Sequence, residues 1–141
     1  MEALKKQLDQ HKGQQGLYII KPKSQEVLKD ICNKLNFPYS SEIAYIGKAE
    51  KTKTSDLRNR AKQEMGWTNF EGATFVRKIG LYLGYDVKDK KNKELRDNTR
   101  DFILKNFTIN IVPLPDGVNV QQEETVYIRQ YKPCLNSKKV G

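Results

Sequence analysis

Three short runs of β-forming apolar residues stand out along the chain, at residues 16–20, 43–47 and 107–112. The first is a compact run that Lys21 and Pro22 close, which is typical of a buried strand. The third alternates apolar and polar residues as a half-buried strand does, and we expect Pro113 and Pro115 to end it. The pattern therefore predicts three strands separated by longer connecting segments.

Apolar residues recur at helical spacing in the segments before, between and after these strands. The predicted helices cover residues 1–11, 24–35, 54–66, 73–84, 95–106 and 118–130, the first of them short and weak. Thr54, Ser55 and Asp56 offer N-caps for the third helix, and Gly84 suits the C-terminal end of the fourth. Strands and helices interspersed over a small sheet predict an α/β or α+β sandwich. Residues 1–141 show no internal repeat and no linker, so we expect one domain.

Positive charge concentrates in the middle of the 141-residue chain, whose formal net charge is +9. Residues 48–100 hold 14 basic and 8 acidic residues and so contribute +6 of that charge. A concentrated basic tract favours a polyanionic partner, because phosphates release counterions when Lys and Arg bind them. A soluble basic surface without a partner fits the charge equally well, so charge leaves both interpretations open.

Histidine and cysteine are scarce, which removes several chemistries. Cys32, Cys134 and His11 cannot build a Cys/His zinc site, and His11 in its polar stretch is interpreted as a solvated surface residue. No apolar run approaches the roughly 20 residues of a membrane-spanning helix, and the N-terminus lacks the apolar stretch of a secretion signal. We expect a cytoplasmic protein in a reducing compartment that does not contact membranes.

The last predicted helix carries one acidic residue on its apolar face. At about 100° per residue, Glu124 lies within the stripe of Val120, Tyr127 and Ile128, while Glu123 falls about 80° to the side. An ionised carboxylate that faces a core is costly unless a cation pairs with it. A metal ion and a structural salt bridge to an arginine both meet that need, and helix geometry does not decide between them.

Four segments combine into a recognisable pattern. They are Gly16-Leu17-Tyr18, Tyr45-Ile46-Gly47-Lys48, Leu57-Arg58-Asn59-Arg60, and Glu124 followed by Lys132-Pro133-Cys134-Leu135-Asn136. In this order they resemble the GIY-YIG nuclease family over residues 16–136, nearly the whole chain. The resemblance implies a small central, mainly antiparallel three-stranded sheet flanked by helices. It also implies a core at about 16–136 with insertions at about 21–42 and 67–106.

The resemblance further implies an activity, the metal-dependent hydrolysis of phosphodiester bonds in DNA with one Mg²⁺ or Mn²⁺ ion per active site. Glu124 would hold the ion, which prefers oxygen ligands, and Arg60 would bind the phosphate with its planar fork. Arg58 competes with Arg60 for this role, because it lies nearer the apolar stripe of its helix. The Leu-x-x-Arg spacing of the family favours Arg60.

Two tyrosines complete the implied site. Tyr18 would act as the general base for water, and Tyr45 would orient the water or the phosphate, both from one side of the sheet. An unperturbed phenol has a pKa near 10, so the role of Tyr18 requires a nearby cation. Lys48 and a metal-bound hydroxide are the candidates for activating the phenol.

Two further residues have implied supporting roles, and one position departs from the family. Gly47 would permit close approach of backbone or ligand at the strand end. Asn136 would support Glu124 or a water on the metal, although a turn residue after Pro133 is an equal alternative. The histidine that some members carry one turn after the arginine is absent, and Glu64, which occupies its place, receives no role.

The basic residues of the chain are candidates for contacts with nucleic acid. They are Arg58 and Arg60, with Arg77, Lys78, Arg96 and Arg100 in the second insertion. A non-catalytic nucleic-acid-binding module on the same fold is the alternative to an enzyme. RNA stays open beside DNA, double-strand cleavage would need a homodimer or two successive visits, and restriction, repair, mobile-element and phage roles stay open.

Overall fold

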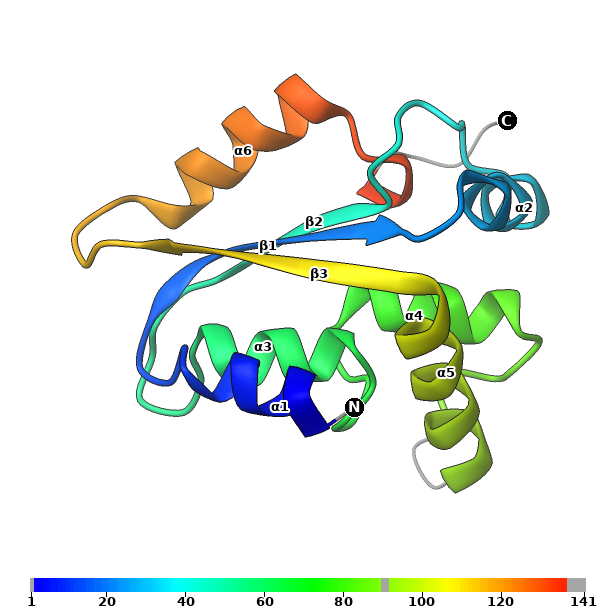
Figure 1. Ribbon diagram of the computed structural model, residues 1–141, viewed down its shortest axis with the longest axis horizontal. Coiled ribbons are helices and arrows are strands. Elements are labelled where there is room, and N and C mark those ends of the chain that lie inside the picture. Colours follow the sequence, from blue (N-terminus) through cyan, green and yellow to red (C-terminus); the bar gives the residue numbers. More distant parts are fainter. Residues whose placement is uncertain (1, 90–91, 137–141) are drawn as a thin grey trace.

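The computed structural model describes residues 2–89 and 92–136. Within them, three strands form one antiparallel sheet with the order β2-β1-β3 (Figure 1). The strands are β1 (Gln15–Pro22), β2 (Tyr45–Ala49) and β3 (Phe107–Leu114). The expected α/β fold around a small antiparallel three-stranded sheet is confirmed.

Each predicted helix is present, with its ends shifted by a few residues. The helices are α1 (Glu2–Asp9), α2 (Gln25–Leu35), α3 (Leu57–Glu64), α4 (Thr74–Tyr82), α5 (Lys93–Asn106) and α6 (Val120–Tyr131), followed by the 3-10 turn η1 (Cys134–Asn136). Of the three N-cap candidates for α3, Asp56 is the cap, since its side chain accepts a hydrogen bond from the Asn59 N–H at 2.9 Å. None of the helices in the described residues is long and apolar enough to span a bilayer.

Strand ends differ from the prediction. Lys21 and Pro22 do not close β1 but belong to it, because they pair with Thr108 and Phe107 of β3. β2 begins at Tyr45 rather than Ile43, because the carbonyls of Ile43 and Ala44 accept hydrogen bonds from the backbone of η1 at 3.0 and 2.8 Å. Pro113 does not end β3, which continues to Leu114. β3 lies at an edge of the sheet, where a missing N–H need not break the ladder.

Helices cover both faces of the sheet. Figure 1 shows α6 on one face, α1, α3, α4 and α5 on the other, and α2 at one end. Side chains alternate along a strand, so Tyr18 and Ile20 face the larger core, while Leu17 points to the α6 side. Tyr18 is paired with Gly47, and Leu17 with Lys48. The α3 face of β2 therefore carries Gly47, and the α6 face carries Lys48.

Candidate active site

Two tyrosines lie side by side on the α3 face of the sheet, as the sequence predicts. Tyr18 on β1 is only 1% exposed, whereas Tyr45 on β2 is half-buried, and their ring centroids are 6.4 Å apart. The ring of Tyr18 lies across Gly47, where an added Cβ would come within 2.2 Å of the tyrosine Cζ. Gly47 thus permits a close approach, but the group that approaches is the Tyr18 phenol rather than the backbone or ligand that the sequence suggested.

Glu64, which received no role from the sequence, lies at the centre of this arrangement. It is the last residue of α3 and is completely buried, at 0% exposure. The Tyr18 hydroxyl donates a hydrogen bond to Glu64 Oε2 at 3.0 Å, and the Val76 N–H donates to Oε1 at 3.2 Å. Leu57, Ala61 and Glu64 follow the i, i+4, i+7 spacing of a buried helix face, so this spacing was a signal for its burial.

The Glu64 carboxylate also caps a neighbouring helix. The N-cap position of α4 is Ala73, whose side chain makes no capping hydrogen bond. Glu64 accepts hydrogen bonds from the first-turn N–H groups of Phe75 and Val76 instead. Burial raises the pKa of Glu64 above its ordinary value of 4.5, opposed by these hydrogen bonds and by the charge of Arg60. α3 and α4 are therefore joined through one buried carboxylate.

Arg60 rather than Arg58 lies with the tyrosines. The positive charge of Arg60 acts to lower the pKa of Tyr18, Tyr45 and Glu64, which places its guanidinium near all three groups. Its Nη1 donates to Gln63 Oε1 at 2.8 Å, so the side chain is held along α3. Arg58 instead donates to Asn59 Oδ1 at 3.3 Å and lies near Asp9 of α1.

Neither tyrosine has the lowered pKa that a phenolate base would need. Burial, followed by the negative charge of Glu64, raises the pKa of Tyr18 well above 10 and that of Tyr45 to about 12. Lys48, considered above as the activating cation, lies on the α6 side of β2 and pairs with Glu50 at 2.9 Å. Both phenols are therefore neutral near pH 7.

Glu124 approaches the same strand from the opposite layer. It lies on α6, half-buried, and its negative charge raises the pKa of Tyr45. Burial and then the charge of Glu50 raise the pKa of Glu124, while Lys48 lowers it. No hydrogen bond or ion pair joins the Glu124 carboxylate to any residue in 2–89 or 92–136, so the arginine salt bridge considered above does not form there.

The donors around Glu124 fit a largely hydrated cation. The described residues contain no group of three or more His, Cys, Asp or Glu side chains that could enclose a metal. A hard divalent cation such as Mg²⁺ keeps several waters and needs only one or two carboxylates from the protein. Glu124, half-buried and with a second carboxylate near it, meets that requirement.

Asn136 supports the edge of the sheet rather than Glu124. Its Oδ1 accepts a hydrogen bond from the Ile46 N–H at 2.8 Å, and its Nδ2 donates to the Ile46 carbonyl at 2.8 Å. β2 is an edge strand, so its outer backbone groups have no strand partner. The Asn136 amide thus pairs with the strand that carries Tyr45 and Gly47, a role that neither predicted alternative describes.

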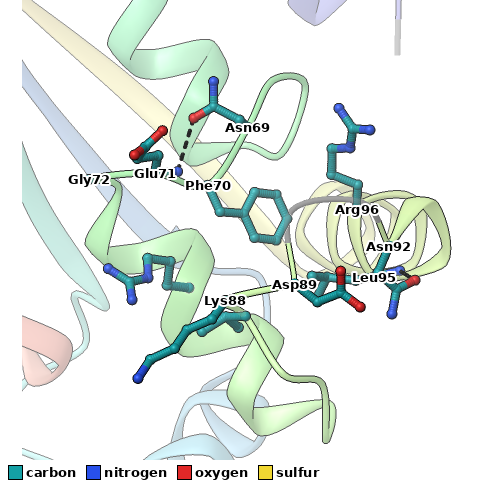
Figure 2. A pocket seen from close by; sticks show the side chains of 11 residues that line it. Asn69, Phe70, Glu71, Gly72, Lys88, Asp89, Asn92, Leu95 and Arg96 are labelled. Atoms are coloured by element: carbon teal, nitrogen blue, oxygen red, sulfur yellow. Dashed lines mark hydrogen bonds between the residues drawn. The ribbon is translucent and has the colours of Figure 1, made fainter.

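The predicted nucleic-acid residues of segment 67–106 separate into two groups. Arg77 and Arg96 line a cavity of about 260 Å³ between the 69–72 loop, α4 and α5. In Figure 2, Phe70 points into this cavity, with Lys88, Leu95 and Arg96 around it. Lys78 donates to the Leu135 carbonyl, and Arg100 pairs with Asp97 at 3.1 Å. The first group is thus the better candidate for DNA phosphates.

The 69–72 loop, which forms one wall of the cavity, is hydrogen-bonded to Arg60 and Gln63 of α3. Arg60 Nη2 donates to the Gly72 carbonyl at 3.5 Å, and Gln63 Nε2 donates to the Glu71 carbonyl at 2.6 Å. Gly72 and Glu71 both line the cavity. A polyanion that contacts the cavity would therefore lie beside the guanidinium.

Comparison with known proteins identifies the family of the chain. The family model described as the GIY-YIG catalytic domain matches residues 16–140. Comparison with curated proteins and with solved structures gave no match. The family match includes both tyrosines, the α3 arginines and the α6 glutamate. Sequence order, fold and family match thus lead to one conclusion: the chain belongs to the GIY-YIG catalytic domain family, a family of endonucleases.

Proposed function

We propose that this chain is a metal-dependent endonuclease that hydrolyses phosphodiester bonds in DNA. The observation that carries the proposal is that candidate catalytic side chains from both layers of helices lie close to strand β2. Arg60 and the two tyrosines lie on the α3 side. From the α6 side a half-buried Glu124, which has no hydrogen bond or ion pair within residues 2–89 and 92–136, approaches Tyr45. The family match supports nuclease activity in general, and the basic middle of the chain supports a polyanionic substrate.

Each group has a role that suits phosphodiester hydrolysis. Negative charge grows on the phosphate oxygens during this reaction, so catalysis consists largely of positioning and electrostatic stabilisation. The planar Arg60 guanidinium would bind two phosphate oxygens, and Tyr45 would orient the phosphate or the water. Glu124 would hold one Mg²⁺ or Mn²⁺ ion, and the bound ion would supply Lewis-acid stabilisation of the phosphate.

The test is cleavage of plasmid DNA by the purified chain with Mg²⁺. We expect the wild type to nick or cut the plasmid, and Glu124→Ala to abolish cleavage while DNA binding persists. Glu123→Ala is the matched control, because it removes a neighbouring carboxylate of α6 and should cleave normally. Cleavage by Glu124→Ala at the wild-type rate would refute the assignment of Glu124.

A non-catalytic nucleic-acid-binding module is the second candidate function. It is favoured by the cavity beside α5, where the side chains of Arg77, Lys88 and Arg96 make no hydrogen bond or ion pair to the described part of the chain. DNA binding without cleavage by the wild type would establish this alternative. Matched DNA and RNA duplexes would identify the nucleic acid, and a comparison of nicked with linear products would show whether two active sites act together.

A further inference from the structure

The proposed hydrolysis leaves one proton without an acceptor. A water that attacks phosphorus must lose a proton, and the family resemblance described above gives the role of accepting it to the Tyr18 hydroxyl. That phenol is neutral at pH 7, because burial and Glu64 raise its pKa well above 10. A neutral phenol accepts a proton effectively only when it passes its own proton on at the same time. The hydrogen bond from Tyr18 to Glu64 shows where that proton would go.

We propose that Glu64 is a positioning residue that receives, through the Tyr18 hydroxyl, the proton released by the attacking water. This inference rests on the proposed endonuclease function. It rests on the 3.0 Å hydrogen bond between Tyr18 Oη and Glu64 Oε2 and on the complete burial of the carboxylate.

The transfer balances without a free phenolate. The water O–H bond breaks, its oxygen forms a bond to phosphorus, and its proton moves to Tyr18 Oη. The Tyr18 O–H bond breaks in the same step, and that proton moves to Glu64 Oε2. The bond from phosphorus to the leaving oxygen breaks, and this oxygen keeps the electron pair and takes a proton from solvent. When the cleaved strand leaves, Glu64 returns its proton through Tyr18 to a water that enters the vacated phosphate site, which restores the starting state.

The groups around Glu64 suit a proton acceptor. Tyr18 of β1 and Tyr45 of β2 face it, Arg60 lies near it on its own helix, and the Phe75 and Val76 N–H groups of α4 bond to it. The N–H groups fix the carboxylate in place, so its Oε2 remains aimed at the tyrosine. Burial raises the pKa of Glu64, which makes its carboxylate a stronger base than an exposed glutamate.

The burial of Tyr18 restricts which water can use this path. Tyr18 is 1% exposed, so bulk solvent has almost no access to the phenol. The half-buried Tyr45 ring and Arg60 are its neighbours toward the proposed phosphate site. The relay therefore serves a water that enters with the bound phosphate.

The pH dependence of single-turnover cleavage tests the relay. Mg²⁺ is kept at saturation, so that metal binding holds Glu124 ionised. The wild-type rate should rise with pH as Glu64 loses its proton and then reach a plateau. Glu64→Gln keeps an oxygen that can accept the Val76 hydrogen bond but cannot take up a proton. Its rate should fall by roughly 100-fold or more, and the rise assigned to Glu64 should disappear.

Glu64→His supplies a different acceptor. An imidazole has an unperturbed pKa of about 6.5, so this variant should recover activity relative to Glu64→Gln, with its rate rising near that pH. Tyr18→Phe keeps the ring on Gly47 and removes the hydroxyl, and it should lose the same rise in rate. The double variant Tyr18→Phe/Glu64→Gln should be no slower than the slower single variant, because both changes interrupt one path.

Controls separate the relay from folding and from the proposed function. Glu26→Gln makes the same chemical change at an exposed side chain of α2 and should leave rate and pH profile unchanged. Thermal unfolding reports whether each variant is folded, and Tyr18→Phe carries the test if Glu64→Gln unfolds. A wild type that never cleaves DNA refutes the endonuclease proposal. A wild type that cleaves, with Glu64→Gln matching its rate and pH profile, refutes the relay alone.

Discussion

At the scale of single residues, Glu64 shows what the sequence could and could not reveal. The family motifs identified the two tyrosines and implied that both lie on one side of the sheet, which the strand register of the structure bears out. Arg60 was favoured over Arg58 by spacing alone, and the structure places Arg60 with the tyrosines. Glu64 was overlooked because an acidic residue on a polar helix is usually solvated. Its N–H partners belong to α4, and the sequence does not show that α4 packs against the end of α3.

Glu64 also predicts a pH dependence of folding stability. Burial raises its pKa above 4.5, so the folded chain holds this proton more tightly than the unfolded chain does. The resulting stabilisation is full below about pH 4.5 and is lost as the pH rises through the folded pKa. Urea unfolding at about pH 4 and pH 8 should show the wild type losing stability relative to Glu64→Gln. An unchanged difference between the two proteins would contradict this.

At the scale of secondary-structure elements, the ends of the strands depend on hydrogen-bond partners that are distant in sequence and that the sequence does not reveal. Apolar periodicity located α1 to α6, because apolar residues recur at helical spacing along each of them. β2 was placed two residues early, since nothing local indicates that η1 takes the carbonyls of Ile43 and Ala44. Pro113 was taken as a strand end, because edge position is a property of the assembled sheet.

Asn136 should contribute to stability through the edge of β2. Asn136→Ala leaves the N–H and carbonyl of Ile46 without their 2.8 Å partners, at an expected cost of about 1–3 kcal/mol in the free energy of unfolding. Asn110→Ala is the matched control, because Asn110 is exposed on β3. Chemical denaturation of both variants provides the measurement. Equal stability of the two would show that the Asn136 amide does not support the strand.

At the scale of the whole molecule, the candidate site depends on both layers of the fold. α3 brings Arg60 and Glu64 to one face of the sheet, while α6 brings Glu124 toward Tyr45 from the other. The sequence placed Arg60 and Glu124 on their helices, and the family resemblance implied that both tyrosines lie on one side of the sheet. It could not show that Lys48 and Glu124 share the opposite, α6 side. That division follows from strand register, which long-range pairing sets.

The most direct test of the central claim compares Arg60→Lys with Arg58→Lys in single-turnover cleavage of one defined DNA duplex with Mg²⁺. Both variants keep the charge of α3, and each loses one planar guanidinium. If Arg60 holds the phosphate beside the tyrosines, Arg60→Lys should slow cleavage by roughly 100-fold, with Arg58→Lys close to the wild type. A wild-type rate for Arg60→Lys, or a larger loss for Arg58→Lys, would contradict the account.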